Sequence, residues 1–254
     1  MPYSHPQPID RSKALRQVPH LVPGALLLAG TAGFVNSVGL GFFRTPVSHM
    51  TGAVSHLGLD LANGSRGDAL ASLGIILGFV FGAMLAGILV GAWKLIPGRR
   101  YGVALMLEGA LLALATGLIL QKQRLGLTLL SMSCGLQNAM SSSYCGLIIR
   151  TTHVTGTMTD IGVMIGHWIR HRQIEGWKLF FLVRIALAFA TGGWMGAVCE
   201  RSLGLAALGI ASAGCILAGG AFWFATHRGL VDLLQDARPL PPATASFPNQ
   251  RPQQ

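Results

Sequence analysis

A histidine flanked by hydroxyl residues occurs twice in this chain, in nearly the same local sequence. The two copies read Ser48-His49-Met50-Thr51-Gly52 and Thr152-His153-Val154-Thr155-Gly156, and their histidines are 104 positions apart. Ser48 and Thr152 are good N-cap residues, so each copy predicts the start of a short helix. The first turn of a helix carries unpaired N–H groups and a partial positive charge, which can hold an anion or a carboxylate. The imidazoles can also take up protons near neutral pH.

Each histidine motif is preceded by an asparagine inside an apolar run. The two segments have their asparagines 102 positions apart and read Gly33-Phe34-Val35-Asn36-Ser37 and Gly135-Leu136-Gln137-Asn138-Ala139. An amide at such a depth either hydrogen-bonds a neighbouring helix or coordinates a substrate, and both interpretations stay open. We predict that the two copies line a substrate path formed by Asn36, Ser48, His49, Thr51, Asn138, Thr152, His153 and Thr155.

Two ionisable residues, Glu108 and Arg184, lie well inside apolar runs. At 1.5 Å per helical residue, both sit roughly 9–12 Å from the same end of their helices. An unpaired charge at that depth costs at least about 2.5 kcal/mol, so we expect the two to form an intramembrane charge pair. A structural ion pair, snorkelling of Arg184 to the membrane surface, and a role in coupling or substrate recognition all remain open. Neither residue has a counterpart in the other copy of the repeat.

Other chemistry finds little support in the residues. His167 and His171 have the spacing of two metal ligands on a helix, but they alternate with Arg170 and Arg172, which disfavours a cation. The chain contains no Ser/His/Asp set, no His-Glu-x-x-His and no glycine-rich phosphate loop. We therefore predict no metal, no cofactor and no enzymatic activity. The four cysteines lack Cys-x-x-Cys spacing and are expected to be buried thiols.

The composition is that of a membrane protein. Hydrophobic residues make up 51% of the chain and charged residues 11%, whereas a soluble domain has about 25% charged residues. The 19 Lys and Arg exceed the 9 Asp and Glu. These basic residues cluster between apolar runs and not along one face, so they indicate cytoplasmic loops and not nucleic-acid binding. We expect the partners to be the lipid bilayer and a small-molecule solute, and a homo-oligomer is left open.

Six apolar runs reach the length of about 20 residues that a transmembrane helix needs. We predict all-α, polytopic architecture with spans at 21–43, 69–93, 101–120, 125–149, 178–199 and 203–226. The ends, 1–20 and the Pro-rich segment 236–254, are predicted to be disordered. The first run resembles a signal peptide, but its repeat counterpart is internal, so we keep it as a span.

The distribution of Lys and Arg sets the orientation. With both termini cytoplasmic, most basic residues lie inside, and the outer loops hold only Arg44, Arg66, Lys122, Arg124 and Arg201. Two membrane repeats, 21–120 and 125–226, would then contain three spans each and lie inverted relative to one another. Short re-entrant or interfacial helices should follow spans 1 and 4. We expect the first histidine motif near the outer face and the second near the inner face, with a site near the midplane.

The doubled Gly-x-x-Asn and Ser/Thr-His-x-Thr-Gly pattern resembles the YoaK-like family of bacterial membrane proteins, a domain of unknown function. The resemblance covers about residues 22–226. That family usually reads Gly-Phe-Val-Asp-Ala in the first copy, with Met-Thr/Ser-Gly-Asn further on, so Asn36 and Ala53 depart from its pattern. If that Asp carries a proton or cation in other members, this chain has lost it. The resemblance implies a multi-pass inner-membrane protein, often described as a transporter, and supplies no site residues.

These observations favour a secondary transporter or permease of a small polar or anionic solute in a bacterial inner membrane, with proton coupling through the paired histidines. One alternative is a passive channel or an exporter of a hydrophobic compound. Another is a membrane scaffold or sensor that transports nothing and uses the repeat only for packing.

Overall fold

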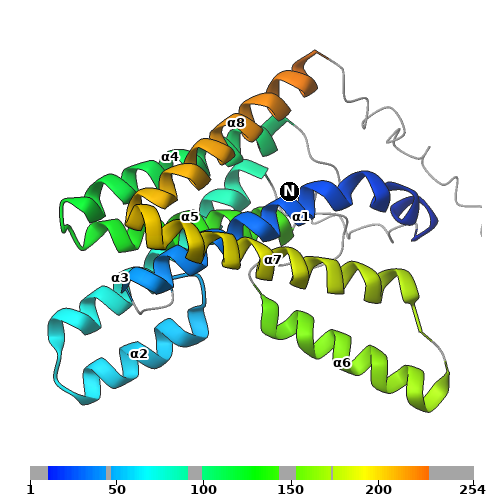
Figure 1. Cartoon of the computed structure of the whole chain (residues 1–254), viewed down its shortest axis with the longest axis horizontal. Helices are drawn as coiled ribbons and strands as arrows, with labels where there is room; N and C mark the ends of the chain where they lie inside the picture. Colours follow the sequence, from blue (N-terminus) through cyan, green and yellow to red (C-terminus); the bar gives the residue numbers. More distant parts are fainter. Residues whose placement is uncertain (1–10, 44–46, 91–98, 143–152, 173, 229–254) are drawn as a thin grey trace, which may run out of the picture.

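The structure is a computed structural model that describes residues 11–43, 47–90, 99–142, 153–172 and 174–228. These ranges contain helices and no strand (Figure 1), which confirms the all-α prediction. The helices are α1 (Arg11–Phe43), α2 (Met50–Ala62), α3 (Arg66–Val90), α4 (Arg99–Leu120), α5 (Leu125–Ser142), α6 (Val154–His171), α7 (Gly176–Leu203), the short 3-10 helix η1 (Gly204–Ala207) and α8 (Leu208–His227). Because α1 begins at Arg11, helix covers part of the segment predicted to be disordered; 236–254 lies outside the described residues.

Four helical stretches are long and apolar enough to cross a membrane: Val22–Phe43, Arg66–Val90, Arg100–Leu120 and Gly176–His227. The last has 52 residues, about 78 Å of straight helix against a hydrocarbon core of about 30 Å. It is not straight, because the chain turns at η1, where Gly204 has a φ of 57°. The stretch therefore consists of two helices, α7 and α8. The described part of α5 is more polar, since it carries Gln137 and Asn138.

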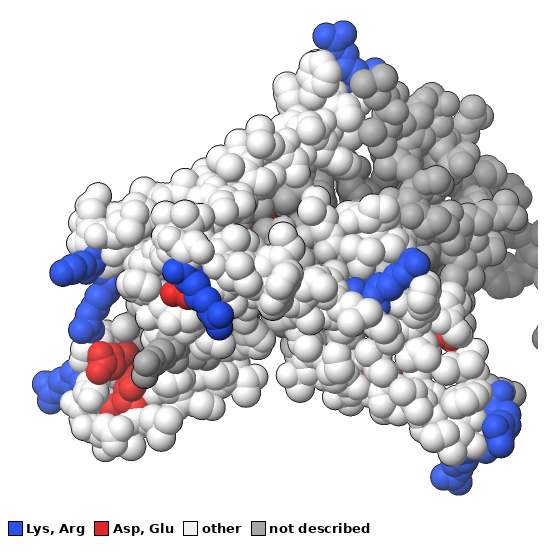
Figure 2. Space-filling model, viewed as in Figure 1, with Lys and Arg blue, Asp and Glu red and all other residues white. Residues whose placement is uncertain are grey.

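Large apolar side chains face outward from these helices. Leu27, Leu70, Trp194 and Leu217 are each at least 60% exposed. Figure 2 shows a surface that is mostly uncharged, with most of the visible Lys and Arg near the ends of the molecule. An apolar surface of this extent suits a lipid environment, because water would leave it unfavourably hydrated.

Glycines let the helices of one half pack directly on the backbone of the other half. The main pairs are α1 with α7, α3 with α5, and α4 with α8. A Cβ on Gly33 of α1 would collide with the carbonyl oxygen of Phe189, and one on Gly135 of α5 would collide with that of Phe79. Gly33 and Gly135 are 102 positions apart, and Phe79 and Phe189 are 110 apart. Exchanging the halves therefore maps the contact of α1 with α7 onto that of α5 with α3.

The contact between α4 and α8 follows the same rule. A Cβ on Gly102 would collide with the carbonyl oxygen of Gly219, and one on Gly109 with that of Ser212. The hydroxyl of Ser212 also donates a hydrogen bond to the carbonyl of Gly109 at 2.7 Å. Position 212 is 110 residues after 102, and position 219 is 110 residues after 109. The contact of Gly102 with Gly219 in one half therefore corresponds to the contact of Ser212 with Gly109 in the other. Residue numbers rise along α4 as they fall along α8, so these helices are antiparallel.

In the pairs α1–α7 and α3–α5 the residue numbers rise together. On α3 and α5, for example, Gly78 faces the backbone of Thr128 and Gly82 faces that of Met132. These two pairs are therefore parallel. A buried core between them, including Val38, Leu112, Leu130 and Leu208, fills the centre of the molecule.

Short helices follow the first and fourth apolar runs, as the sequence predicts. In Figure 1, α2 and α6 begin near the middle of the molecule and diverge toward opposite sides. Helix α2 packs against α3, whereas α6 packs only along α7 and none of its residues is buried.

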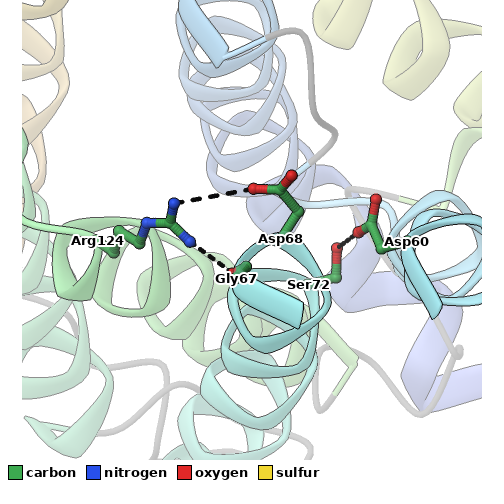
Figure 3. A network of polar contacts seen from close by, with 5 residues as sticks. All are labelled: Asp60, Gly67, Asp68, Ser72 and Arg124. Carbon is green, nitrogen blue, oxygen red and sulfur yellow. Dashed lines mark hydrogen bonds and ion pairs between the residues drawn. The ribbon is translucent and has the colours of Figure 1, made fainter. Parts of the chain in front are cut away.

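The far end of α2 is tied to α3, and α3 is tied to the start of α5 (Figure 3). Ser72 donates a hydrogen bond to Asp60 at 2.8 Å, and Arg124 donates one to the carbonyl of Gly67 at 2.5 Å. Arg124 also lies 3.9 Å from Asp68, but both side chains are exposed, so this ion pair contributes little stability. These contacts fix where α2 ends and leave its first turn facing the middle of the molecule.

Candidate functional site

The start of α2 is bound to the middle of α1 by three polar side chains. Ser48 Oγ donates a hydrogen bond of 2.6 Å to Oδ1 of the buried Asn36. His49 Nδ1 lies 3.0 Å from Ser48 Oγ and 3.2 Å from the same Asn36 oxygen. A proton on Nδ1 would therefore be shared with Asn36, which leaves Nε2 for another partner. The Asn36 amide serves as an anchor between helices, and it presents His49 at the start of α2.

The prediction that Ser48 caps α2 is wrong. His49 occupies the N-cap position, and no side chain caps the helix there. The reason is that the Ser48 hydroxyl is already engaged by Asn36. The first intrahelical bond runs from the Ala53 N–H to the His49 carbonyl. The N–H groups before Ala53 have no partner within the helix, and the His49 side chain does not cap them.

The start of α6 has the same arrangement. His153, and not the predicted Thr152, is its N-cap residue, again without a side-chain cap, and Thr152 itself lies outside the described residues. The Thr157 N–H bonds the His153 carbonyl at 3.1 Å, as Ala53 bonds His49 in α2. The ring of His153 lies over Gly156, where a Cβ would collide with Nδ1. This contact explains the glycine at the fifth position of the second motif.

The two histidines are coupled electrostatically. Burial lowers the pKa of His49, and the positive charge of His153 lowers it further. That the two motifs lie near opposite faces of the membrane stays a prediction. The chain turns back after α1, because His49 must reach Asn36, and α2 then begins inside the molecule. The ring of His49 also meets Phe189 of α7 edge to face, with 6.4 Å between centroids.

The remaining residues of the predicted substrate path lie on α2, α5 and α6. Thr51 and Thr155 lie exposed on the first turns of α2 and α6. Asn138 is half-buried on α5, one residue after Gln137, whose amide donates a hydrogen bond of 3.2 Å to the Leu28 carbonyl of α1. The structure thus brings Asn36, Ser48 and His49 together, and His153 is coupled electrostatically to His49.

Phe189 was missed by the sequence reasoning. It touches both the Gly33 backbone and the His49 ring. Phe79, which is 110 positions earlier, meets Gly135 in the same way. Extending the repeat beyond the histidine motifs would have revealed this pair.

The predicted pair of Glu108 and Arg184 does not form. Glu108 is 2% exposed on α4, beside Cys215 of α8. Arg184 is exposed on α7, with its guanidinium 4.0 Å from the centre of the Phe180 ring. Equal depth along two helices does not bring side chains together when the helices are not neighbours, and α4 and α7 are not.

The described residues contain no group of three or more His, Cys, Asp or Glu that could hold a metal ion. A cavity of about 410 Å³ lies elsewhere, between α1, α7 and α8, and is mostly apolar. Its lining includes Leu26, Gly30 and Phe34 of α1, Thr191 and Met195 of α7, and Gly214 of α8.

The fold and the site define an all-helical protein of membrane type, with apolar helices and a histidine at the start of each of two short helices. The family described as "Protein of unknown function (DUF1275)" matches residues 24–221, and the chain belongs to this family. The match is consistent with the YoaK-like resemblance. No curated protein and no solved structure matches the chain.

Proposed function

We propose that the protein is a secondary transporter of a small polar or anionic solute in a bacterial inner membrane, with both termini cytoplasmic and no enzymatic activity. The observation that carries this proposal is that His49 and His153, which are coupled electrostatically, are the N-cap residues of α2 and α6. A helix N-terminus favours negative charge beside it. Transporters commonly bind anionic groups between such half-helices.

The helix directions support a six-span chain. If α1, α3, α4, α5, α7 and α8 each cross the membrane, successive spans alternate in direction. The first and fifth spans must then be parallel, as must the second and fourth, whereas the third and sixth must be antiparallel. The observed pairs α1–α7, α3–α5 and α4–α8 meet this requirement. Three spans in each half would make the repeats inverted, the usual arrangement around a central transport site.

The electrostatics of the site support coupling to protons. Burial and a positive charge on His153 both disfavour a proton on His49. An anion bound beside His49 would offset this repulsion and raise the proton affinity of its ring. By linkage, protonation would then raise the affinity for the anion. Uptake of an anion with protons follows from these two statements.

The test is uptake into proteoliposomes that carry a pH gradient, with formate, acetate and phosphate as probes. We expect uptake of at least one probe, a loss of tenfold or more in His49→Gln and in His153→Gln, and retention in the control His56→Gln on α2. Flux that persists without a gradient would favour the passive channel. If neither variant changes the uptake of any probe, the proposed site is contradicted. If no probe is taken up at all, the scaffold or sensor is favoured.

The cavity between α1, α7 and α8 favours one second candidate, an exporter of a hydrophobic compound. A Cβ on Gly214 meets open space, so Gly214→Leu fills the cavity without disturbing the helix contacts. Gly220 on the same helix also has open space and does not line the cavity. Extrusion of an apolar dye that is lost in Gly214→Leu but retained in Gly220→Leu would support the exporter.

A further inference from the structure

Glu108 is an acid buried at the contact of three helices. It lies on α4, which packs against α5 and α8. Its side chain is 2% exposed, and its atom Oε2 has no hydrogen-bond partner among the described residues. The thiol of Cys215 on α8 lies beside the carboxyl group. A buried polar atom without a partner is rare and calls for an explanation.

Among the described residues, no cation pairs with this acid. The thiols of Cys134 on α5 and Cys215 on α8 are the titratable groups that face it from the helices packed against α4. In the part of the chain that the structure describes, the one ion pair joins Arg124 and Asp68 at the surface. An isolated carboxylate in an apolar interior is far more costly than a neutral acid, so the neutral form fits this place.

The surroundings of Glu108 also separate it from water. Its neighbour Gly109 lies directly against the Ser212 carbonyl, so α4 and α8 touch backbone to backbone beside the acid. The position 110 residues further along the chain is Ala218, so the other half has no equivalent acid. One molecule therefore holds a single buried acid of this kind within its described helices.

Helix α5 connects Glu108 to the repeated amides. Cys134 and Asn138 are four residues apart, so they lie on one face of α5, about 6 Å apart along its axis. The acid thus lies next to the helix face that carries the second copy of the asparagine. A separation of α4 and α8 would expose both the acid and this face.

We propose that Glu108 is a proton-binding site, which carries a proton while α4, α5 and α8 are closed and releases it when the contact of α4 with α8 opens to water. The bound proton neutralises the carboxylate, and its loss restores the charge, with no other reactant. The role of this proton in transport rests on the proposed function; its presence on Glu108 does not.

The experiment uses dicyclohexylcarbodiimide, an apolar reagent that reacts with protonated carboxyl groups in apolar surroundings. The acid adds to the carbodiimide, the O-acylisourea rearranges to a stable N-acylurea, and no group leaves. The full chain in phosphatidylcholine vesicles at pH 7 should give one adduct per molecule, located on Glu108 by mass spectrometry. Labelling should fall at least tenfold in Glu108→Gln and at alkaline pH, and remain in the control Glu200→Gln.

Absence of an adduct on Glu108 would overturn the inference, whatever the protein transports. An adduct whose yield does not change with pH would overturn it too, because such an acid does not exchange its proton. If Glu108→Gln fails to fold, the shorter acid in Glu108→Asp should keep the pH-dependent labelling. An adduct on Glu108 in a protein that moves no probe would count against the proposed function alone. In an active transporter, Glu108→Gln should lose gradient-driven uptake tenfold or more yet retain exchange of labelled for unlabelled solute.

Discussion

Burial lowers the pKa of His49, and a positive charge on His153 lowers it further, so the two residues are coupled electrostatically. They are 104 positions apart and come from equivalent places in the two halves of the chain. This coupling links the two copies of the motif, because each histidine is the N-cap residue of its own short helix.

Removing His153 should raise the pKa of His49. In His153→Asn the repulsive charge is gone, while the burial that contributes most to the lowered pKa remains. The upward shift should therefore be partial, and NMR titration of labelled histidine measures it. His56→Asn on α2 is the matched control and should leave the His49 titration in place. An unchanged His49 in His153→Asn would show that the two rings are not neighbours.

The lowered pKa of His49 predicts a pH-dependent stability. Above its ordinary value of 6.5, His49 is neutral in both the folded and unfolded states and has no effect. As the pH falls below 6.5, the unfolded state takes up a proton first, so the folded state loses stability down through the lowered pKa. Melting in detergent should therefore occur at a lower temperature at pH 5.5 than at pH 7.5. His49→Gln should show a smaller difference, and an equal difference in both proteins would rule out this contribution.

Ser48→Ala should destabilise the protein by about 1–3 kcal/mol, because it leaves the buried oxygen of Asn36 without its 2.6 Å hydrogen bond. Thermal or denaturant unfolding in detergent measures the loss. Ser55→Ala at an exposed position of α2 should change stability by less than about 0.5 kcal/mol. Equal effects of the two substitutions would mean that the bond to Asn36 is not made.

Alanine at Gly33 or Gly135 should force helices apart. The added methyl group would collide with a backbone carbonyl, which no rotamer change can relieve, so we expect a loss of about 1–3 kcal/mol or more from each. At Gly87 the methyl group meets open space, and the higher helix propensity of alanine should add about 0.5–1 kcal/mol. The change in the free energy of unfolding should therefore have opposite signs at the two kinds of glycine, and thermal unfolding in detergent measures it. A stabilised Gly33→Ala would contradict the helix contacts.

The helices were predictable because a long apolar run in a chain with few charges has few alternatives to helix. The short helices were predictable because a residue of capping type follows each of the two apolar runs, Ser48 in the first copy and Thr152 in the second. The cap itself was not, because the choice of the Ser48 hydroxyl depends on Asn36, twelve residues away. Local sequence does not reveal such a competitor.

The wrong pairing of Glu108 with Arg184 has a geometric cause. Depth along a helix placed both residues at one level, but their helices, α4 and α7, are not neighbours. The repeat did predict the correspondence of His49 with His153, and the structure adds their electrostatic coupling.

The accessibility of these two positions to a charged reagent tests the account most directly. In a chain with its four native cysteines replaced, His49→Cys and His153→Cys are exposed to the anionic reagent sulfonatoethyl methanethiosulfonate from either side of sealed vesicles. Trp194→Cys, at a 70% exposed apolar position, is the lipid-facing control and should not react. We expect both test cysteines to react from both sides, because they belong to one site with alternating access. Reaction of His49→Cys from the outside only and of His153→Cys from the inside only would contradict a single central site.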